Sequence, residues 1–244
     1  MASSNEVSVT TLSGYPPFCF AQDGANVGRS VEVIPPGEDS EVLQGYSWDI
    51  VRESYHAVGY TITLEVNPWA RAEARAAQGE VDLAFPASST EERRANWAFP
   101  EEAVNEASYV IYMDNERRIE WNGLQSFHGK RVGAMRGWSY GQVWDEERSN
   151  INVVLVDDIL GGFRSLSTGR LDGFAGYDLA FDYELRQAGL AGDFIKSPPF
   201  GSSMEYLMGA PDTEGIRQKL EAFDEGRRLI EESGIAAEIE ARWF

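Results

Sequence analysis

The chain has 244 residues, enough for one large domain or two lobes, and 43% of them are hydrophobic, as in a globular protein. A formal net charge of −19 repels nucleic acid and anionic membranes, so we expect neither as a partner. Cys19 is the only cysteine, which excludes an internal disulfide, and no apolar run is long enough to span a bilayer.

The first predicted strand, residues 7–12, leads into an aromatic turn that contains Tyr15, two prolines and Phe18. Because proline fixes φ, this turn holds its rings in place at little entropic cost. The turn is either a corner of the core or part of a site. Residues 22–44 follow as an insertion, which we interpret as a β-hairpin or flap with no assigned role.

Apolar residues at helical spacing predict a helix over residues 48–58, and alternation predicts a strand over residues 60–66. A proline then begins the next helix, which places Trp69 at a loop-to-helix junction beyond a strand's carboxyl end. A core position would be ordinary for this tryptophan, and a ligand contact is the alternative.

The stretch from Gly79 to Pro100 organises the chain. It predicts a helix stop, a short strand over residues 81–85, hydroxyl-bearing residues just beyond that strand, and a short helix that carries Arg93. Ligands of open α/β sheets bind at such strand ends, and a guanidinium suits a carboxylate. The alternative is that Arg93 and Arg94 pair with neighbouring glutamates on a solvated face.

The second half repeats the alternation of strands and helices, and its "GRLD" mirrors the earlier "GEVD". Thr213 is predicted to cap a long helix near the carboxyl terminus. The predicted elements of this half are strands over 130–135, 151–156 and 193–196, helices over 158–168 and 178–188, and a returning segment over 204–209.

Residues 137–141 match G-x-S-x-G, the nucleophile turn of α/β-hydrolases, with Ser139 in the serine position. The hydrolase order requires a histidine after the serine, but His56 and His128 both precede it. A glycine-rich turn that opens a helix also offers N–H donors to an anion, which accounts for the motif without catalysis.

The order Gly-x-x-Asp, strand, Ser-x-Thr-x-x-Arg and aromatic-Pro over residues 79–100 resembles the extracytoplasmic solute-binding proteins of the amino-acid-binding class. The resemblance covers nearly the whole chain outside the insertion. It implies an α/β protein with two lobes, each a mostly parallel sheet flanked by helices, joined by two hinge crossings. Lobe 1 would comprise residues 1–106 and 206–244, and lobe 2 residues 107–205.

The resemblance also implies a ligand site. In the family, residues that match Arg93 and Ser88 hold the ligand's carboxylate, and aromatic residues that match Tyr15 and Trp69 cover its body, with Phe18 as either a contact or core.

From lobe 2, the turn that carries Ser139 would contact the carboxylate, with Trp138 and Tyr140 beside it. Where amino-acid-binding members place an aspartate for the ammonium group, this chain has Tyr177, followed by Asp178. Either Asp178 reaches the ligand, or the ligand lacks an α-ammonium group. A plain helix N-cap is the other interpretation of Asp178.

We therefore expect a monomeric protein, not an enzyme, that binds a small carboxylate-bearing solute and, as the resemblance implies, delivers it to a membrane ABC transporter permease. No motif predicts a cofactor or a metal. The location would be periplasmic or extracellular, with residues 1–4 standing where a leader was removed. The alternatives are the sensor domain of a receptor and a cyclohexadienyl dehydratase-like enzyme, with Glu205 or Asp178 as its acid.

Overall fold

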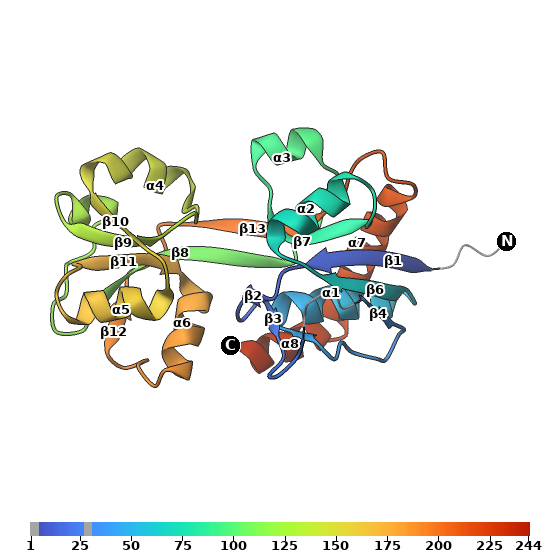
Figure 1. Ribbon diagram of the computed structural model, residues 1–244, viewed down its shortest axis with the longest axis horizontal. Coiled ribbons are helices and arrows are strands. Elements are labelled where there is room, and N and C mark those ends of the chain that lie inside the picture. The colour runs from blue at the N-terminus through green and yellow to red at the C-terminus, as the bar shows by residue number, and fades with distance from the viewer. Residues whose placement is uncertain (1–4, 27–30) are drawn as a thin grey trace. The chain divides into compact units, whose positions relative to one another are not determined.

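The computed structural model describes residues 5–26 and 31–244 (Figure 1), so the interpretation of residues 1–4 lies outside the described residues. Contacts divide the chain into two compact units. Unit 1 contains the residues up to Glu106 together with Met204–Phe244, and unit 2 is Ala107–Ser203. The chain leaves unit 1 within strand β8 (Asn105–Asp114) and returns within strand β13 (Gly201–Met208).

Unit 1 is built on a mixed sheet in the order β13-β7-β1-β6-β4. Strand β1 is parallel to both β6 and β7, whereas β13 and β4 are antiparallel additions at the two sides. Its elements besides β13 are β1 (Glu6–Thr11), β2 (Gly14–Tyr15), β3 (Cys19–Ala21), β4 (Val31–Ile34), β5 (Leu43–Gln44), α1 (Tyr46–Ala57), β6 (Thr61–Val66), α2 (Trp69–Ala77), β7 (Leu83–Ser88), α3 (Glu91–Asn96), α7 (Ile216–Glu232) and α8 (Ile235–Trp243).

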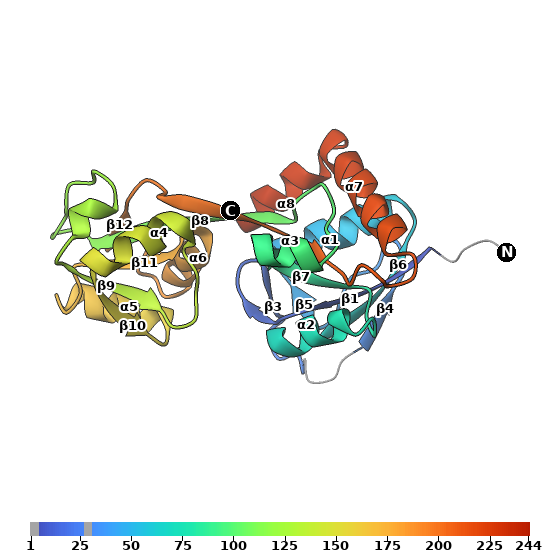
Figure 2. The same cartoon turned by 90° about the horizontal axis from the view of Figure 1, so that it is seen from above.

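Helices cover both faces of the unit 1 sheet. Figures 1 and 2 show α1, α7 and α8 together on one face and α2 on the other. The predicted apolar stripe of α1 is confirmed for Trp48, Val51 and Tyr55, which are fully buried, whereas its fourth member, Val58, is the C-cap and only partly buried. Gly226 lets α7 approach α1 closely, since a Cβ at this position would lie 1.8 Å from the carbonyl oxygen of Ser54. The core of unit 1 therefore forms between this helix layer and the sheet.

Unit 2 has a sheet in the order β10-β9-β11-β8, with β12 on the other side of β8. Strand β9 is parallel to β10 and β11, and β8 is antiparallel to β11. Figure 1 shows α4 on one face and α5 and α6 on the other. Its elements besides β8 are η1 (Leu124–Phe127), β9 (Arg131–Met135), α4 (Gly141–Glu147), η2 (Arg148–Asn150), β10 (Asn152–Val156), α5 (Ile159–Ser167), β11 (Gly173–Tyr177), α6 (Asp178–Gln187) and β12 (Phe194–Lys196).

The predicted hairpin or flap spans residues 22–44, of which 27–30 lie outside the described residues; in the described part, β4 and β5 do not pair with each other as a hairpin would require. Strand β4 pairs with β6 as an antiparallel edge strand of the main sheet, while β5 joins β2 and β3 in a separate three-stranded sheet. The register of β4 turns Val31 and Val33 outward, with 59% and 66% of their surfaces exposed, and buries Ile34. Part of the insertion is therefore a strand, but the partner of an edge strand is set by tertiary contacts.

The predicted cap of the long C-terminal helix was also wrong. Helix α7 begins at Ile216, and its N-cap is Gly215 with a φ of 69°, so Thr213 lies in the preceding turn. By contrast, Asp158 caps α5 by accepting a hydrogen bond of 2.6 Å from the Gly161 amide. Within the described residues, no helix combines the length and the apolar character that a membrane span requires.

Candidate functional site

Three parallel strands of unit 1 end at the same edge of the sheet, and the predicted ligand-binding residues of this unit follow those ends. The short strand β2, which follows β1, carries Tyr15, and α2 begins at Trp69 shortly after β6. Ser88 is the last residue of β7, and Arg93 lies in α3 immediately afterwards. The strand β7 runs three residues beyond its predicted end, so Ser88 sits on the strand rather than in the loop.

Arg93 brings two of these residues together. Its Nη1 donates to the backbone oxygen and the Oγ of Ser88 over 3.2 and 3.3 Å, and its guanidinium carbon lies 5.8 Å from the centre of the Trp69 ring. The backbone is fixed as well, because the Thr90 side chain caps α3 by accepting from the Arg93 amide. The guanidinium is thus held in a defined orientation, and 23% of the side chain is exposed.

Glu73 is a partner of Arg93 that the sequence prediction missed. Its Oε1 accepts from Nη2 of Arg93 at 3.1 Å. Glu73 follows Trp69 by four residues in α2, and residues at this spacing lie on one face of a helix. This spacing was the sequence signal that could have placed Glu73 beside Trp69. The carboxylate holds Nη2 while Ser88 holds Nη1, and it offsets part of the guanidinium charge.

Arg94 has a different environment. Its Nη2 donates to Ser89 Oγ at 2.9 Å, and its guanidinium lies 5.7 and 5.6 Å from the rings of Phe99 and Tyr206. The alternative that both arginines pair with the neighbouring glutamates of α3 is therefore wrong. Arg94 is exposed and binds aromatic faces, whereas Arg93 is half-buried among the candidate site residues.

Tyr15 and Phe18 are stacked, with ring centres 4.8 Å apart. Phe18 is only 1% exposed and also contacts Tyr46 and Phe244. Of the two interpretations of Phe18, its position is that of a core residue that supports the ring of Tyr15. Tyr15 itself is half-buried, and its hydroxyl donates to Glu205 Oε2 over 3.4 Å.

Glu205 belongs to a buried polar network. Asn105 Nδ2 donates to Glu205 Oε2 at 2.7 Å, and Ser47 Oγ donates to Asn105 Oδ1 at 2.8 Å. In the β7–β13 ladder, Glu205 stands directly opposite Ser88. Opposed residues of a ladder project from the same face, with Cβ atoms about 4.5–5.5 Å apart. The Glu205 carboxyl group therefore joins the face on which Ser88 meets Arg93.

Burial affects the protonation of the Glu205 carboxyl group. Loss of solvation raises the pKa of Glu205 to about 7, against the opposing effects of the hydrogen bonds from Asn105 and Tyr15 and of the positive charge of Arg93. Glu205 is 9% exposed. The site of unit 1 thus combines a fixed cation with a carboxyl group whose protonation changes near neutral pH.

The predicted residues of unit 2 gather around Tyr177. The ring of Trp138 lies 4.6 Å from that of Tyr177, and the Tyr177 hydroxyl donates to the backbone oxygen of Ser139 at 2.9 Å. Ser139 is exposed and precedes a short helix, α4. Trp138 follows β9 and Tyr177 ends β11, so aromatic rings mark the carboxyl ends of these parallel strands.

Tyr140 differs from its neighbours, because it is 2% exposed and its hydroxyl is fully engaged. That hydroxyl accepts from the Met135 amide and donates to the Ala175 oxygen. Burial raises the pKa of Tyr140 well above its usual range. Tyr140 is therefore a core residue that fixes the turn after β9. Its burial results from the tertiary fold and not from the local motif.

Asp178 is the first residue of α6, and Tyr177 occupies the N-cap position, so the N-cap interpretation of Asp178 was wrong. Its carboxylate forms an ion pair with Lys196, which also pairs with Asp182 at 2.6 Å. The Tyr112 hydroxyl donates to the Asp178 backbone oxygen and to Asp182. The carboxylate of Asp178 therefore already has a cationic partner within unit 2.

The hydrolase alternative has no support in the histidine positions. His128 contacts Glu147 at 2.6 Å, and His56 contacts the backbone oxygen of Ile34. Neither ring hydrogen-bonds Ser139. In residues 5–26 and 31–244, no three His, Cys, Asp or Glu side chains are grouped so that they could hold a metal ion.

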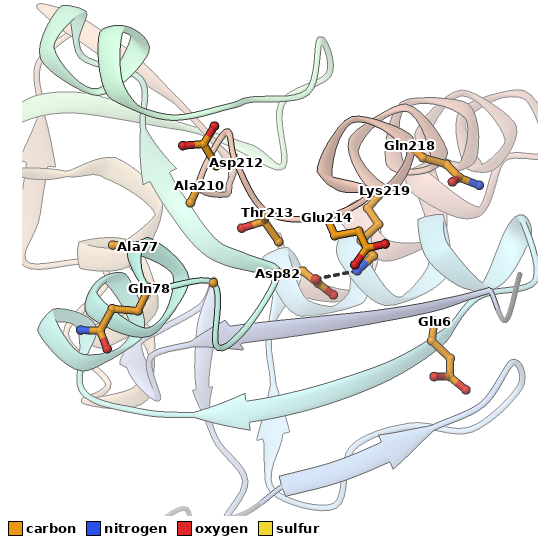
Figure 3. A pocket seen from close by; sticks show the side chains of 11 residues that line it. Glu6, Ala77, Gln78, Asp82, Ala210, Asp212, Thr213, Glu214, Gln218 and Lys219 are labelled. Atoms are coloured by element: carbon orange, nitrogen blue, oxygen red, sulfur yellow. Dashed lines mark ion pairs between the residues drawn. The ribbon is translucent and has the colours of Figure 1, made fainter.

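A separate open cavity of about 760 Å³ lies at the opposite edge of the unit 1 sheet, near the start of β1 and β7 (Figure 3). Figure 3 shows Asp82 directed toward Lys219, with which it forms an ion pair of 2.5 Å. Asp82 also accepts from the amide and hydroxyl of Ser8. These contacts tie α7 to β1, so the acidic group has a structural role in closing this edge of the sheet.

Comparison with known proteins identifies the family of the chain. Residues 35–244 match the family described as bacterial extracellular solute-binding proteins, family 3. No curated protein sequence matches the chain.

Solved structures with low sequence identity share the fold over almost the whole chain. A probable amino-acid ABC transporter extracellular-binding protein from Bacillus subtilis has a TM-score of 0.77 at 16% identity, with 99% of both chains covered. An ABC uptake transporter substrate-binding protein from Streptococcus pneumoniae, solved with bound histidine, has a TM-score of 0.72 at 17% identity, over 98% of this chain and 92% of that one.

A histidine kinase sensor domain with similarity to periplasmic binding proteins has a TM-score of 0.73 at 18% identity, over 98% of this chain and 95% of that one. These neighbours show a fold of the periplasmic-binding-protein type, as the sequence predicted. The family match covers far more than half of the residues. The chain belongs to the bacterial extracellular solute-binding proteins of family 3.

Proposed function

We propose that this protein binds a small carboxylate-bearing solute, an amino acid first, and delivers it to a membrane ABC transporter permease from a periplasmic or extracellular location. The observation that carries the proposal is the placement of Arg93 beside Ser88 and Trp69 at the carboxyl ends of the parallel strands. The similar structure from Streptococcus pneumoniae, which was solved with bound histidine, supports this class of ligand.

The guanidinium of Arg93 is suited to a carboxylate. Its Nη1 and Nη2 bind Ser88 and Glu73, and no described residue accepts a hydrogen bond from its Nε. A guanidinium has five N–H donors in a rigid fork, so donors remain for an incoming anion. The rings of Tyr15 and Trp69 would then cover the ligand's body.

A thermal-shift screen over amino acids and other small carboxylates tests the proposal. Ligand at 100 times its Kd adds roughly 2.7 kcal/mol to the free energy of unfolding, so a true ligand raises the melting temperature measurably. The proposal requires that at least one such compound does so for the wild type and not for Arg93→Ala. A screen in which no carboxylate shifts the melting temperature would refute it.

We also propose that the ligand contacts residues of unit 2, among them Ser139, Trp138 and Tyr177, and closes the two units about the crossing strands β8 and β13. A ligand that contacts both units binds a closed arrangement more tightly than an open one, which shifts the equilibrium. Small-angle scattering with and without a ligand from the screen should show a smaller radius of gyration when the ligand is bound. An unchanged radius at saturation contradicts closure.

The second candidate function is ligand sensing, which the similarity to a histidine kinase sensor domain favours. The complete gene and its neighbours would distinguish sensing from delivery. A sensor requires a membrane segment and a signalling domain in the same polypeptide, whereas delivery requires a permease encoded as a separate chain. Both functions use the same ligand site, so the thermal-shift screen applies to either.

We propose further that the protein has no catalytic activity, dehydratase activity included. Glu205 is the residue best placed to act as an acid, because it is buried beside the candidate site. Incubation with prephenate, followed by ultraviolet absorbance, should give no product above the rate without protein. A product that depends on Glu205 would establish the dehydratase alternative instead.

A further inference from the structure

An amino acid presents an ammonium group as well as a carboxylate, and the ammonium needs an anionic partner in the site. The position expected for that partner carries Tyr177, and Asp178 beside it is paired with Lys196. Lys196 also binds Asp182, so these two carboxylates and one amine form a cluster of their own in unit 2. An ammonium partner must therefore come from elsewhere in the chain.

Glu205 has the geometry for this role. It stands opposite Ser88 in the β7–β13 ladder, on the face where Ser88 meets Arg93. The two hydrogen bonds that its carboxyl group accepts from described residues, Asn105 and Tyr15, both end on Oε2. Oε1 accepts no hydrogen bond from any residue that the structure describes. One carboxylate oxygen is thus anchored, and the other is left for a further donor.

The burial of Glu205 also points to a ligand rather than to stability. Loss of solvation raises its pKa to about 7 and outweighs the hydrogen bonds from Asn105 and Tyr15 and the charge of Arg93, which favour the ionised form. Glu73 already pairs with Arg93, so Glu205 is not needed to neutralise that arginine. Groups that are buried and perturbed in this way gather at functional sites. An incoming cation supplies the missing compensation.

We propose that Glu205 binds the ligand's ammonium group through Oε1, so that unit 1 holds both charged ends of a zwitterionic amino acid. This inference rests on the proposed function, because it assigns the cationic end of the same ligand. Arg93 and Ser88 bind the carboxylate, Glu205 binds the ammonium group, and Tyr15 connects the two by hydrogen-bonding Glu205 beside the ligand. The specificity of the site is then for amino acids over the corresponding acids without the amino group.

Matched pairs of probes test this assignment by titration calorimetry. Each pair is an amino acid and the same acid without its amino group: L-phenylalanine with 3-phenylpropanoate, L-leucine with 4-methylpentanoate, L-glutamate with pentanedioate, and L-arginine with 5-guanidinopentanoate. The proteins are the wild type, Glu205→Gln, which keeps the shape and neutralises the charge, and Asp224→Asn. Asp224 is a half-buried carboxylate of unit 1 whose hydrogen-bond donors, among the residues that the structure describes, are the amides of Glu101 and Glu102, so it serves as the control.

We expect at least one amino acid to bind the wild type about tenfold or more tightly than its partner acid, since hydrogen bonds to charged groups have this strength. In Glu205→Gln that preference should fall to about threefold or less, with the partner acid bound as well as before. Asp224→Asn should behave as the wild type does. The inference is overturned if Glu205→Gln keeps the wild-type preference for the amino acid. It is also overturned if the wild type binds the amino acid and its partner acid equally well. Either result leaves the proposed function standing. If no probe of either kind binds the wild type, the proposed function fails for these acids, and the inference fails with it.

A second measurement on the wild type alone keeps the test valid if Glu205→Gln folds poorly. The titratable and charged groups that face Glu205 are Arg93 from α3, Tyr15 from β2 and Cys19 from β3. Burial raises the pKa of Cys19 to about 12, so this thiol stays neutral, and arginine stays charged. The affinity for the amino acid should rise about tenfold between pH 5.5 and pH 8 as Glu205 ionises. A pH-independent affinity for the amino acid contradicts the inference.

Discussion

The two units share one structural motif, an aspartate that binds a backbone amide of a neighbouring strand, and they differ at the carboxyl ends of their parallel strands. In unit 1, Asp82 of the "GEVD" segment accepts from the amide of Ser8 at the start of β1. In unit 2, Asp172 of the "GRLD" segment accepts from the amide of Arg131 at the start of β9. The mirrored motif is therefore a way of joining a helix–strand turn to the neighbouring parallel strand. Its repetition is structural and carries no information on the ligand.

The carboxyl ends of the strands differ in chemistry. Unit 1 places a guanidinium, two carboxyl groups and two aromatic rings there, whereas unit 2 places the rings of Trp138 and Tyr177 and neutralises Asp178 with Lys196. The charged groups of the candidate site are thus concentrated in unit 1, and under the proposed function these groups would recognise the charged ends of the ligand. Unit 2 would contribute apolar cover and backbone groups.

The largest expected effect comes from removing the cation of unit 1. Arg93→Ala should abolish binding of any ligand found in the screen, because loss of one partner of a part-buried charge pair costs about 3–5 kcal/mol. Titration calorimetry should show an affinity loss of a hundredfold or more, with the circular dichroism spectrum unchanged. Arg94→Ala is the matched control and should bind normally, since Arg94 contacts Ser89 and aromatic rings instead. Equal effects of the two substitutions would refute the assignment of Arg93.

The second-largest expected effect is that of Glu205→Gln on the free energy of unfolding without ligand. The pKa of Glu205 is about 7 in the fold against an ordinary value of 4.5, so its contribution to stability is full below pH 4.5 and is lost as the pH rises through about 7. Because glutamine stays neutral, Glu205→Gln should match the wild type at about pH 4 and exceed it by on the order of 3 kcal/mol at about pH 8. Urea unfolding at the two pH values measures this. A difference that does not change with pH would show that Glu205 is not a buried acid.

The shared aspartates provide a smaller contrast between the units. Asp82→Asn should lower the free energy of unfolding by about 1.5–3 kcal/mol, because it weakens charged hydrogen bonds to Ser8 and the ion pair with Lys219. Asp172→Asn should cost less, since its partner Arg131 is exposed. Neither should change ligand affinity. If either substitution weakened binding as strongly as Arg93→Ala, the structural interpretation of the motif would be wrong.

The aromatic cover of unit 1 should have a modest effect. Trp69→Leu should weaken binding by about 0.5–1.5 kcal/mol, because stacking on a ring is lost while apolar bulk remains. Trp97→Leu, in the turn after α3, controls for the general loss of an indole. Calorimetric titration of both variants separates ligand stacking from packing, and equal affinities in the two would remove Trp69 from the site.

The smallest effect is expected in unit 2. Ser139→Ala should weaken binding by less than about 1 kcal/mol, the ordinary net contribution of one hydrogen bond, because the Ser139 contact with Tyr177 uses its backbone oxygen. Ester hydrolysis, followed with a chromogenic ester, should be absent before and after the substitution. Hydrolysis that disappeared in the variant would restore the hydrolase alternative.

Local sequence patterns determined much of this protein. Helical spacing identified α1, the short pattern Ser-x-Thr-x-x-Arg brought Ser88 and Arg93 to one strand end, and the start of α5 was predicted at Asp158, within one residue of the observed helix. These features depend on residues close together in the chain, so periodicity and capping rules suffice to find them. The order of the motifs was also enough to indicate the family.

Tertiary structure decided the features that join distant segments. Glu205 meets Ser88 across 117 positions of sequence only because β13 returns to pair with β7, and Lys196 engages Asp178 from another strand. Tyr140 is a core residue because the strands around it bury its hydroxyl. No local rule gives such pairings, since burial and charge compensation depend on which strands become neighbours. The charge balance of the site was therefore fixed by the fold and not by any single stretch of the sequence.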